Sequence, residues 1–260
     1  MFKIATWNVN SLRVRVPQVL EWLAKESPDI LALQETKLPD ADFLLKEIND
    51  AGYQVVFSGQ KAYNGVAILS KEPISQIITE FPAFPDPQRR VLAASVGSLR
   101  ILNLYIPNGE SLVSDKFQYK LNWLDHLKQF VSHELKTHEK IIILGDFNIA
   151  PEAVDVHDPN VWEGQILCSE NERSRFKDLI SLGFQDCFRL HPQDDKSFSW
   201  WDYRLNAFKR NLGLRIDHIL ASKGLSGHCT KCYIDKTTRA VERPSDHAVV
   251  VAEFSKNGLA

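Results

Sequence analysis

Short runs of apolar residues, many of them β-branched, recur along the whole chain and are separated by polar turns. Runs of this length and composition predict β-strands. From the third strand to the sixth, the runs follow one another through short turns with little helical spacing, which is typical of antiparallel strands. The predicted strands cover residues 2–7, 29–34, 55–58, 65–69, 74–81, 91–96, 100–106, 141–144, 215–220 and 248–252.

Three segments between these strands have the spacing of amphipathic helices. Apolar residues at positions 19, 20, 22 and 23 predict a helix between the first two strands, and helices are also expected over residues 115–135 and 173–182. No linker rich in Gly, Ser or Pro divides the chain, so we expect one domain over residues 1–260. The many strands favour an α+β fold: a four-layer α/β sandwich of two mostly antiparallel β-sheets packed face to face, with helices outside.

Composition excludes several classes of protein. With 44% hydrophobic and 25% charged residues, the chain is neither a disordered tail nor a disulfide-rich miniprotein. The four cysteines are too few to crosslink 260 residues, and the CxxC of Cys229 and Cys232 is interpreted as a coincidence of two ordinary cysteines. Without a signal peptide or an apolar run of about 20 residues, we expect a cytoplasmic monomer that does not bind membranes. The net charge of −2 argues against a uniformly basic nucleic-acid-coating protein but not against a local basic face.

Polar side chains gather where the predicted strands end or begin. Carboxylate and amide oxygens in these positions could converge on one rim, and such oxygens suit a hard cation such as Mg²⁺, which Mn²⁺ could replace. A zinc site is not indicated, because the chain contains neither HExxH nor paired CxxC motifs. The residues in these positions are Asn8, Asn10, Glu35, Tyr105, Asn108, Asp146, Asn148, Asp217, Asp246 and His247.

Each of these positions also has a purely structural interpretation. Asn after a strand and Gly-Asp at a strand end are common turn formers, and Asp246 could be a helix cap or a surface charge. Asp217 differs, because a carboxylate between Ile216 and Ile219 is costly to bury without a partner. His247 is the natural candidate for that partner, although a histidine satisfied within the core remains the alternative.

Seven short motifs strengthen the catalytic interpretation because they occur together in one order. Each motif is weak alone, but in this order they resemble the exonuclease III family of AP endonucleases, within the endonuclease/exonuclease/phosphatase superfamily. The resemblance extends from residue 6 to residue 248 and therefore covers nearly the whole chain. The motifs are residues 6–13 (TWNVNSLR), 33–37 (LQETK), 105–110 (YIPNGE), 145–150 (GDFNIA), 198–204 (FSWWDYR), 213–217 (GLRID) and 244–248 (PSDHA).

The resemblance implies a metal site and a water-activating group. Glu35 would be the direct metal ligand, with Asn10 and Asp246 close to the ion. Asp146 would orient or deprotonate the attacking water and would be held in place by Asn8. Attack on a phosphodiester needs such an activated water, and Mg²⁺ can stabilise the charge that develops on the phosphate and on the leaving oxygen.

The resemblance also implies a set of phosphate contacts. Asn148, close to the metal, and Tyr105 would contact the scissile phosphate, with Asn108 beside it. Asp217 would orient and polarise His247, which would contact a phosphate oxygen. An imidazolium supported by a carboxylate can stabilise the negative charge that grows on the phosphate oxygens.

The stretch of residues 196–215 interleaves five basic residues with five aromatic ones and contains one acidic residue. This pattern suits binding to backbone phosphates together with a wedge or stacking surface for an unstacked nucleotide. Trp200 and Trp201 should point to opposite faces of a strand, so at most one should be buried. The structural alternative for this stretch is that some of its rings, such as Phe198 and Tyr203, fill the core. The resemblance implies that Trp200 and Leu214 line a pocket for a base-free sugar, and Trp201 is included among the candidate DNA contacts.

Six other basic residues and one tyrosine could contact the DNA backbone, although lone basic side chains usually belong to the solvated surface. Arg90 is the strongest of these candidates because it adjoins a predicted strand. No helix-turn-helix or zinc-finger pattern is present, so recognition should depend on DNA shape and deformability. The candidates are Arg13, Lys37, Lys61, Tyr63, Arg89, Arg90 and Lys116.

Three functions are compatible with these observations. The leading hypothesis is a Mg²⁺-dependent nuclease that cleaves 5′ to abasic sites in duplex DNA and also acts at 3′ ends, as a 3′-to-5′ exonuclease and a 3′-phosphatase or phosphodiesterase. The second is a superfamily phosphoesterase acting on an inositol phosphate or a lipid. The third is a catalytically silent DNA-binding relative, against which the complete set of candidate catalytic residues argues.

Overall fold

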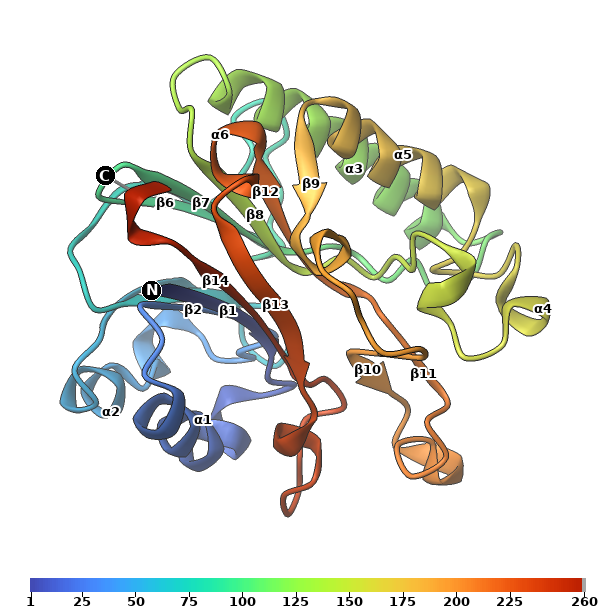
Figure 1. Ribbon diagram of the computed structural model, residues 1–260, viewed down its shortest axis with the longest axis horizontal. Coiled ribbons are helices and arrows are strands. Elements are labelled where there is room, and N and C mark those ends of the chain that lie inside the picture. The colour runs from blue at the N-terminus through green and yellow to red at the C-terminus, as the bar shows by residue number, and fades with distance from the viewer. Residues whose placement is uncertain (259–260) are drawn as a thin grey trace.

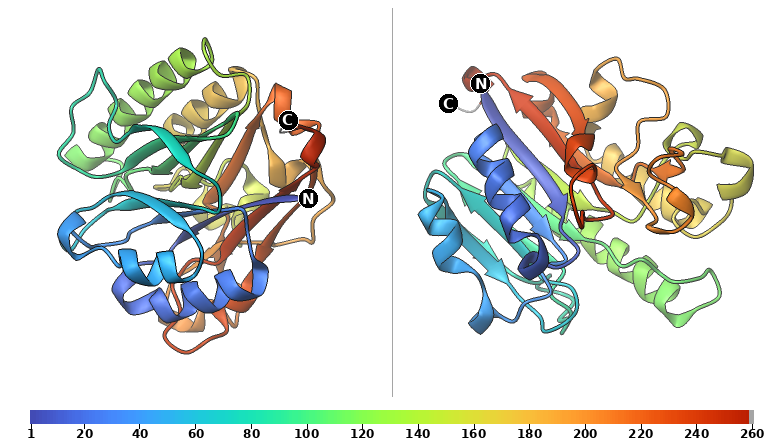
Figure 2. Two further views of the ribbon diagram at one scale, coloured as in Figure 1. Left: turned by 90° about the vertical axis from the view of Figure 1, so that its left-hand side faces the viewer. Right: turned by 90° about the horizontal axis from the view of Figure 1, so that it is seen from below.

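The structure is a computed structural model that describes residues 1–258 of the 260-residue chain. Two β-sheets lie face to face, and helices cover the outer face of each sheet (Figures 1 and 2). The predicted four-layer α/β sandwich is therefore confirmed. No helix within residues 1–258 is both long enough and apolar enough to cross a membrane.

The first sheet has six strands in the order β13-β14-β1-β2-β4-β3. Only β1 and β2 are parallel, and helix α1 joins them because parallel neighbours cannot be connected by a tight turn. The elements of this layer are β1 (Phe2–Asn8), α1 (Leu12–Glu26), β2 (Ile30–Gln34), α2 (Leu45–Asp50), β3 (Gln54–Ser58), β4 (Val66–Ser70), β13 (Cys229–Asp235) and β14 (Val249–Phe254).

The second sheet also has six strands, in the order β5-β6-β7-β8-β12-β9. Its one parallel pair is β7 and β8, joined by helix α3. The elements are β5 (Ile74–Ile78), β6 (Val91–Val96), β7 (Leu99–Tyr105), α3 (Asp115–Glu134), β8 (Ile141–Asp146), α5 (Glu170–Ser181), β9 (Phe184–Asp186) and β12 (Asp217–Ser222).

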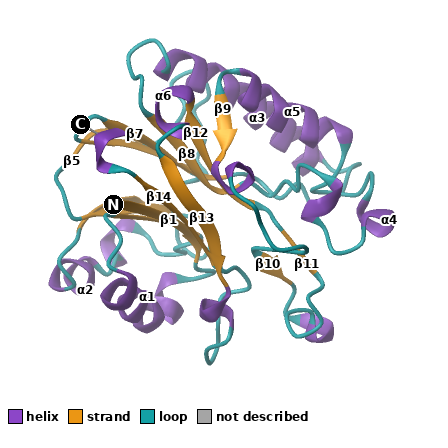
Figure 3. Ribbon diagram, viewed as in Figure 1, coloured by secondary structure: helices purple, strands orange, loops and turns teal. Residues whose placement is uncertain are grey.

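Short elements complete the described part of the chain. A two-stranded ribbon of β10 and β11 lies beside the sandwich (Figure 3). These elements are α4 (Pro159–Trp162), β10 (Trp200–Trp201), β11 (Gly213–Leu214), α6 (Lys223–Ser226) and the 3₁₀ turns η1 (Asp40–Asp42), η2 (Ala153–Asp155), η3 (Cys187–Leu190), η4 (Arg204–Asn206), η5 (Lys236–Arg239) and η6 (Lys256–Gly258).

The central strands are buried on both faces, so their side chains alternate between two apolar cores. In β1, Ile4 faces the core between the sheets, whereas Ala5 faces the core beneath α1 and α2. In β8, Ile142 faces the other sheet and Ile143 packs beneath α3 and α5. Strands of this kind are almost continuously apolar, which explains why the sequence pattern identifies them so clearly.

The structure differs from the sequence prediction mainly in short or irregular elements. β13 was not predicted because a β-bulge between Cys229 and Lys231 interrupts the alternation of its side chains. The helix predicted from residue 173 begins at Glu170, where Ser169 and Glu172 form a capping box. β9, β10 and β11 have only two or three residues each, too few to show a period.

Candidate functional site

The polar residues expected at one rim lie there because of the strand directions. Each parallel pair, β1–β2 and β7–β8, delivers its carboxyl ends to this rim, and the antiparallel neighbours β12 and β14 begin there. Asp217, for example, is the first residue of β12 and lies opposite Asp146, the last residue of β8. The topology therefore brings together side chains that are up to 239 residues apart, from Asn8 to His247.

One amide group, that of Asn8, connects the two halves of the site. Its Nδ2 donates to Glu35 Oε1 at 2.9 Å and to Asp146 Oδ2 at 2.8 Å, which uses both of its N–H groups. Its Oδ1 accepts from the backbone N of Asn10 at 3.0 Å, which fixes the orientation of the amide. Asn8 thus holds two carboxylates at fixed positions at the end of β1.

Ligand atoms of Glu35, Asp146 and His247 lie within 4.8 Å of one another. Carboxylate oxygens dominate this group, and Asn10 and Asp246 add further oxygens beside it, joined by a 3.0 Å hydrogen bond from Asn10 Nδ2 to Asp246 Oδ1. Hard divalent cations take such oxygen donors and keep some of their waters. The residues therefore fit a metal ion of this class, and the acidic site expected from the sequence is present.

Lys37 lies at the same acidic group. Its Nζ is 2.8 Å from Glu35 Oε2 and donates to Asn10 Oδ1 at 2.5 Å. Burial alone would raise the pKa of Glu35, but the Lys37 ammonium and the Asn8 hydrogen bond outweigh it and lower that pKa. Glu35 is therefore ionised at neutral pH, as a metal ligand must be.

His247 and Asp217 form a buried pair on the opposite side of the site. His247 Nδ1 lies 2.9 and 3.1 Å from the two Asp217 carboxylate oxygens, and Ser199 Oγ donates to Asp217 Oδ2 at 2.7 Å. Burial disfavours a charged imidazole, but Asp217 and Asp146 outweigh it and raise the pKa of His247 to about 10. His247 is therefore an imidazolium at neutral pH, and Asp217 is the partner that its buried position required.

Asp146 has the electrostatic environment of a general base. Burial raises its pKa to about 7, and the His247 charge, whose Nε2 is 3.7 Å from Asp146 Oδ2, limits the rise. A carboxylate that titrates near neutral pH can accept a proton more readily than an ordinary one. Asp246 shows the opposite behaviour: burial raises its pKa, but His247 and the 2.9 Å hydrogen bond from Trp200 Nε1 outweigh burial and lower it.

Asn148, Tyr105 and Asn108 line the second-sheet side of the site. Asn148 adopts φ +49°, and its Nδ2 donates to Ile106 O at 3.0 Å while its Oδ1 accepts from Asn108 Nδ2 at 3.1 Å. Burial raises the pKa of Tyr105 well above 10, so the phenol remains protonated and can donate a hydrogen bond. The Arg90 guanidinium lies 4.5 Å from the centre of the Tyr105 ring.

A buried ion pair supports this side, and sequence reasoning missed it. Lys120 Nζ donates to the backbone oxygens of Asn108 at 3.1 Å and Asn148 at 2.7 Å, and it pairs with Glu172 Oε1 at 2.5 Å. Both side chains are fully buried. The available signal was a lysine on the apolar face of α3, next to Leu121.

The stretch of residues 196–215, which interleaves basic and aromatic residues, is only partly as expected. Trp200 is half-buried and borders a hollow of about 560 Å³ that also includes His157, Trp162 and Arg204. Trp201 is fully buried and donates from Nε1 to Asn211 Oδ1 at 3.1 Å, so it offers no surface to DNA. Trp200 and Trp201 thus point to opposite faces of the strand, as predicted, and only Trp200 is accessible to solvent.

Three further expectations for this stretch need correction. Leu214 is fully buried behind Trp200, packed against residues such as Val156 and Ile216, so it supports the hollow from behind. Tyr203 is 51% exposed instead of filling the core, whereas Phe198 is buried as expected. Arg215 is not a surface cation, because it is buried and paired with Asp155 and Asp186.

The remaining basic candidates differ in their exposure. Lys116 is exposed and pairs with Glu110 at 3.0 Å, and Arg13 is exposed beside Asp42.

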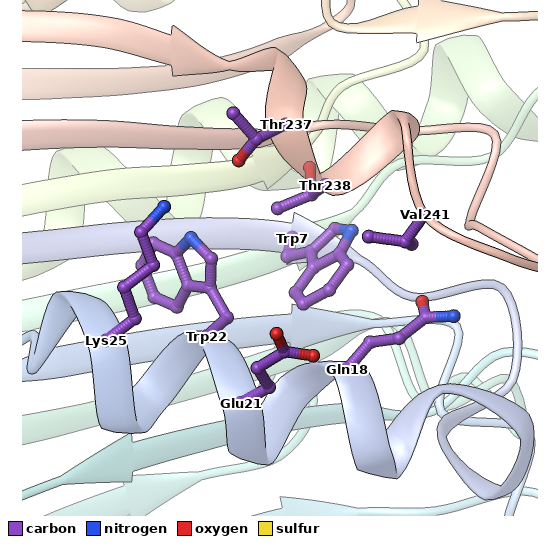
Figure 4. Close-up of a pocket in the computed structure, with 8 residues that line it drawn as sticks. All are labelled: Trp7, Gln18, Glu21, Trp22, Lys25, Thr237, Thr238 and Val241. Carbon is purple, nitrogen blue, oxygen red and sulfur yellow. The ribbon is translucent and has the colours of Figure 1, made fainter.

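A separate hollow of about 190 Å³ lies on the α1 side of β1, between Trp7, Trp22 and Thr238 (Figure 4). Trp7 Nε1 donates to His247 O at 3.2 Å, so this hollow lies behind the acidic group and not within it.

Comparison with known proteins agrees with this geometry. The Endonuclease/Exonuclease/phosphatase family matches residues 5–247, and the chain belongs to that family. Within it, the chain belongs with the exonuclease III-like DNA-repair nucleases. It is 37% identical to exodeoxyribonuclease III of Haemophilus influenzae, over 97% of this chain and 99% of that protein. It is 31% identical to the DNA repair nuclease APEX1 of Danio rerio, over 95% of this chain and 80% of that protein.

Solved structures show the same relationship. The 3′ phosphatase NExo from Neisseria, bound to a product DNA hairpin, has a TM-score of 0.96 and 49% identity, with 98% of this chain and 100% of that chain covered. An AP endonuclease from Archaeoglobus fulgidus has a TM-score of 0.93 and 39% identity, with the same coverage. The fold and the family expected from the seven motifs are confirmed.

Proposed function

We propose that this chain is a Mg²⁺-dependent nuclease that hydrolyses the phosphodiester 5′ to abasic sites in duplex DNA and also acts on 3′ ends. The observation that carries the proposal is the Asn8 bridge between Glu35 and Asp146, with the His247–Asp217 pair facing it. This arrangement holds a base, the Asp146 carboxylate, and a cation, the His247 imidazolium, on either side of one small space. We further propose that the chain acts as one catalytic domain, as a monomer and in the cytoplasm.

Each residue of the site would have a defined task. Asp146 orients the attacking water and takes its proton, while Asn8 keeps the carboxylate in position. The His247 imidazolium stabilises the negative charge that grows on the phosphate, and Asp217 keeps the ring protonated at Nδ1 and correctly turned. Tyr105 and Asn148 hold the phosphate from the second-sheet side by donating hydrogen bonds.

The metal site would lie at Glu35, with Asn10 and Asp246 beside it. A bound Mg²⁺ supplies Lewis-acid stabilisation of the phosphate and of the leaving 3′ oxygen. Lys37 is in contact with the same oxygens, so it can neutralise part of their charge before the metal arrives. Trp200 and the hollow beside it would receive the nucleotide that lacks a base, because an abasic duplex bends and unstacks more easily than an intact one.

The proposal is tested with four duplex oligonucleotides: one with an internal tetrahydrofuran, one with a recessed 3′-phosphate, one with a recessed 3′-hydroxyl and one intact and blunt-ended. Each is incubated with Mg²⁺ or with EDTA. We expect metal-dependent incision immediately 5′ to the tetrahydrofuran and processing of both recessed ends. Relatives of this chain include an AP endonuclease, a 3′-5′ exonuclease and a 3′ phosphatase, so the relative rates on the first three substrates assign the main activity.

Two variants separate catalysis from binding. Asp146→Asn should abolish turnover while leaving DNA binding measurable, and Asp178→Asn, a change of an exposed aspartate paired with Lys128, is the matched control and should remain active. Hydrolysis of an inositol phosphate or a lipid with no cleavage of any DNA substrate would refute the proposal. DNA binding without hydrolysis by the unmodified protein would favour the catalytically silent alternative.

A further inference from the structure

Three of the four cysteines meet at an open edge of the sandwich. Cys229 and Cys232 lie on β13, the edge strand of the first sheet. Cys187 begins η3, directly after β9, the edge strand of the second sheet. All three side chains are buried in the core between the sheets, so the cluster joins the two edges.

A backbone irregularity brings the two β13 cysteines to the same face. Residues three apart on a regular strand point to opposite faces of the sheet. In β13, Cys229 lies opposite Phe254 and Lys231 lies opposite Glu253, so Thr230 is an extra residue in the ladder. This β-bulge turns both Cys229 and Cys232 inward. The CxxC that was interpreted as a coincidence is therefore part of one thiol cluster.

Cys229 has a different environment from the other cysteines. Its Sγ lies 3.5 Å from His191 Nε2, and it accepts a hydrogen bond from the Cys187 thiol. That hydrogen bond and the adjacent His191 lower the pKa of Cys229 to about 6, although burial opposes the shift. The same contact and burial raise the pKa of Cys187 well above 9. The pair therefore contains one thiolate-forming sulfur and one thiol that stays protonated.

Cys229 lies nearer the surface than Cys187, although both are buried. Cys229 is 9% exposed and Cys187 is fully buried. His191, which contacts Cys229, lines a polar surface hollow of about 160 Å³ together with Arg189 and Lys196. A small uncharged oxidant in this hollow would be separated from the Cys229 sulfur by the His191 side chain alone, and the Cys187 thiol donates its hydrogen bond to that sulfur.

We propose that Cys229 is an oxidation-sensitive thiol that forms a reversible disulfide with Cys187 when a hydroperoxide reaches it. The Cys229 thiolate attacks the outer oxygen of the peroxide, the O–O bond breaks, and Cys229 becomes a sulfenic acid while hydroxide or alkoxide leaves and is protonated. The Cys187 sulfur then attacks the Cys229 sulfur and its proton leaves with the hydroxyl as water. Two thiols lose two electrons in total, and the peroxide is reduced; a dithiol restores the pair.

The cluster is better suited to this redox reaction than to metal binding. Within residues 1–258, the residues whose ligand atoms converge closely enough to hold an ion are Glu35, Asp146 and His247. The cysteine and histidine atoms of the thiol cluster do not form such a group. A disulfide needs only two sulfur atoms that can reach each other in suitable geometry, whereas a zinc site needs four ligands around one point.

The test is peptide mapping of the intact protein after exposure to hydrogen peroxide at neutral pH. We expect a loss of two thiols, a mass decrease of about 2 Da and a crosslinked peptide joining Cys187 to Cys229, all reversed by dithiothreitol. In the unmodified protein, alkylation of Cys229 should be more than about tenfold faster than that of Cys168, because burial without a comparable thiol partner raises the pKa of Cys168 to about 12.

Variants identify the attacking and the resolving sulfur. Cys187→Ala should stop the crosslink and leave a Cys229 sulfenic acid that dimedone traps, whereas Cys168→Ala, the matched control, should form the crosslink as before. Equal reactivity of Cys229 and Cys168 would overturn the proposal, as would a crosslink of Cys229 to Cys232 or one stoichiometric zinc in the purified protein. The alkylation comparison needs no variant, so it holds even if a substitution impairs folding.

Discussion

Replacing Lys120 by methionine removes a fully buried charge that holds two loops of the site. The methionine side chain fills nearly the same volume, but it cannot donate to the Asn108 and Asn148 carbonyl oxygens or neutralise Glu172. Glu172 would remain buried as an unpaired carboxylate. Burial lowers the pKa of Lys120, and Glu172 offsets only part of that shift, so the charge on Lys120 depends on its partner.

The expected cost is about 3–5 kcal/mol, the range for removing one partner of a buried ion pair. With a urea m-value of about 3 kcal/mol/M, the unfolding midpoint should fall by about 1 to 1.7 M. Tryptophan fluorescence can follow the transition, because the chain has six tryptophans. Lys128→Met on the same helix is the matched control: its pair with Asp178 is nearly half exposed, so it should cost less than about 1 kcal/mol.

A second substitution tests whether the unpaired Glu172 carboxylate causes the loss of stability. In the Lys120→Met background, Glu172→Gln removes that charge while keeping one oxygen that can accept from the backbone N of either Leu167 or Ser169, which donate to separate oxygens of Glu172. The double variant should therefore be more stable than Lys120→Met alone. If Lys120→Met cost no more than Lys128→Met, the buried pair would not be supporting the site, and the reasoning would fail.

Further predictions concern the pH profile and the DNA surface. Burial raises the pKa of Asp146 to about 7, and Asp146 must be ionised to act as a base, so kcat/KM should rise with pH over roughly one unit either side of 7. The inflection of this profile should move to lower pH as the Mg²⁺ concentration is increased. A flat profile would contradict the role of Asp146 as the general base. Arg90→Ala should weaken DNA binding and reduce the slope of log K against log salt by about one, whereas an unchanged slope would exclude a phosphate contact. Trp201→Ala should cost about 3–5 kcal/mol in urea unfolding, while Trp200→Ala should leave stability almost unchanged and raise KM for abasic DNA; the reverse pattern would show that their positions are misassigned.

The sequence predicted the long, buried elements well and the irregular ones poorly. A strand such as residues 141–144 is apolar on both faces, so its pattern depends on local sequence alone. β13 depends on a bulge whose position is set by its partner β14, and β10 and β11 depend on tertiary packing around Trp201. The hydrophobic pattern within those segments therefore does not predict that they are strands.

The candidate site could be predicted where its residues lie at the ends of buried strands. The positions of Asn8 and Asp146 follow from the ends of buried strands, and the partnership of Asp217 with His247 follows from the cost of burying a carboxylate. Lys120 could not be assigned because its partners are backbone oxygens and a glutamate 52 residues away. The burial of Arg215 could not be foreseen either, since a basic residue in a basic stretch gives no sign of its acidic partners.

The strand orders of the two sheets have a consequence for how the chain is assembled. Each sheet has the same plan: a central parallel pair with its crossover helix, flanked on either side by an inner strand and then by an edge strand that precedes it in sequence. The two sheets thus share one strand plan, although the sequence shows no repeat that corresponds to it. The second sheet comes wholly from residues 74–222, whereas the first combines residues 2–70 with residues 229–254.

This division makes the C-terminal strands the last part of the first sheet to be synthesised. β14 lies between β13 and β1, and Phe2 pairs with Phe254, so strands from the first and last parts of the described chain are neighbours in one sheet (Figure 1). Asp246 and His247 directly precede β14, so every strand of the second sheet is synthesised before the imidazolium of the site. The same closeness of β1 and β14 suggests a circular permutant, opened between β4 and β5, in which each sheet would be encoded by one continuous segment.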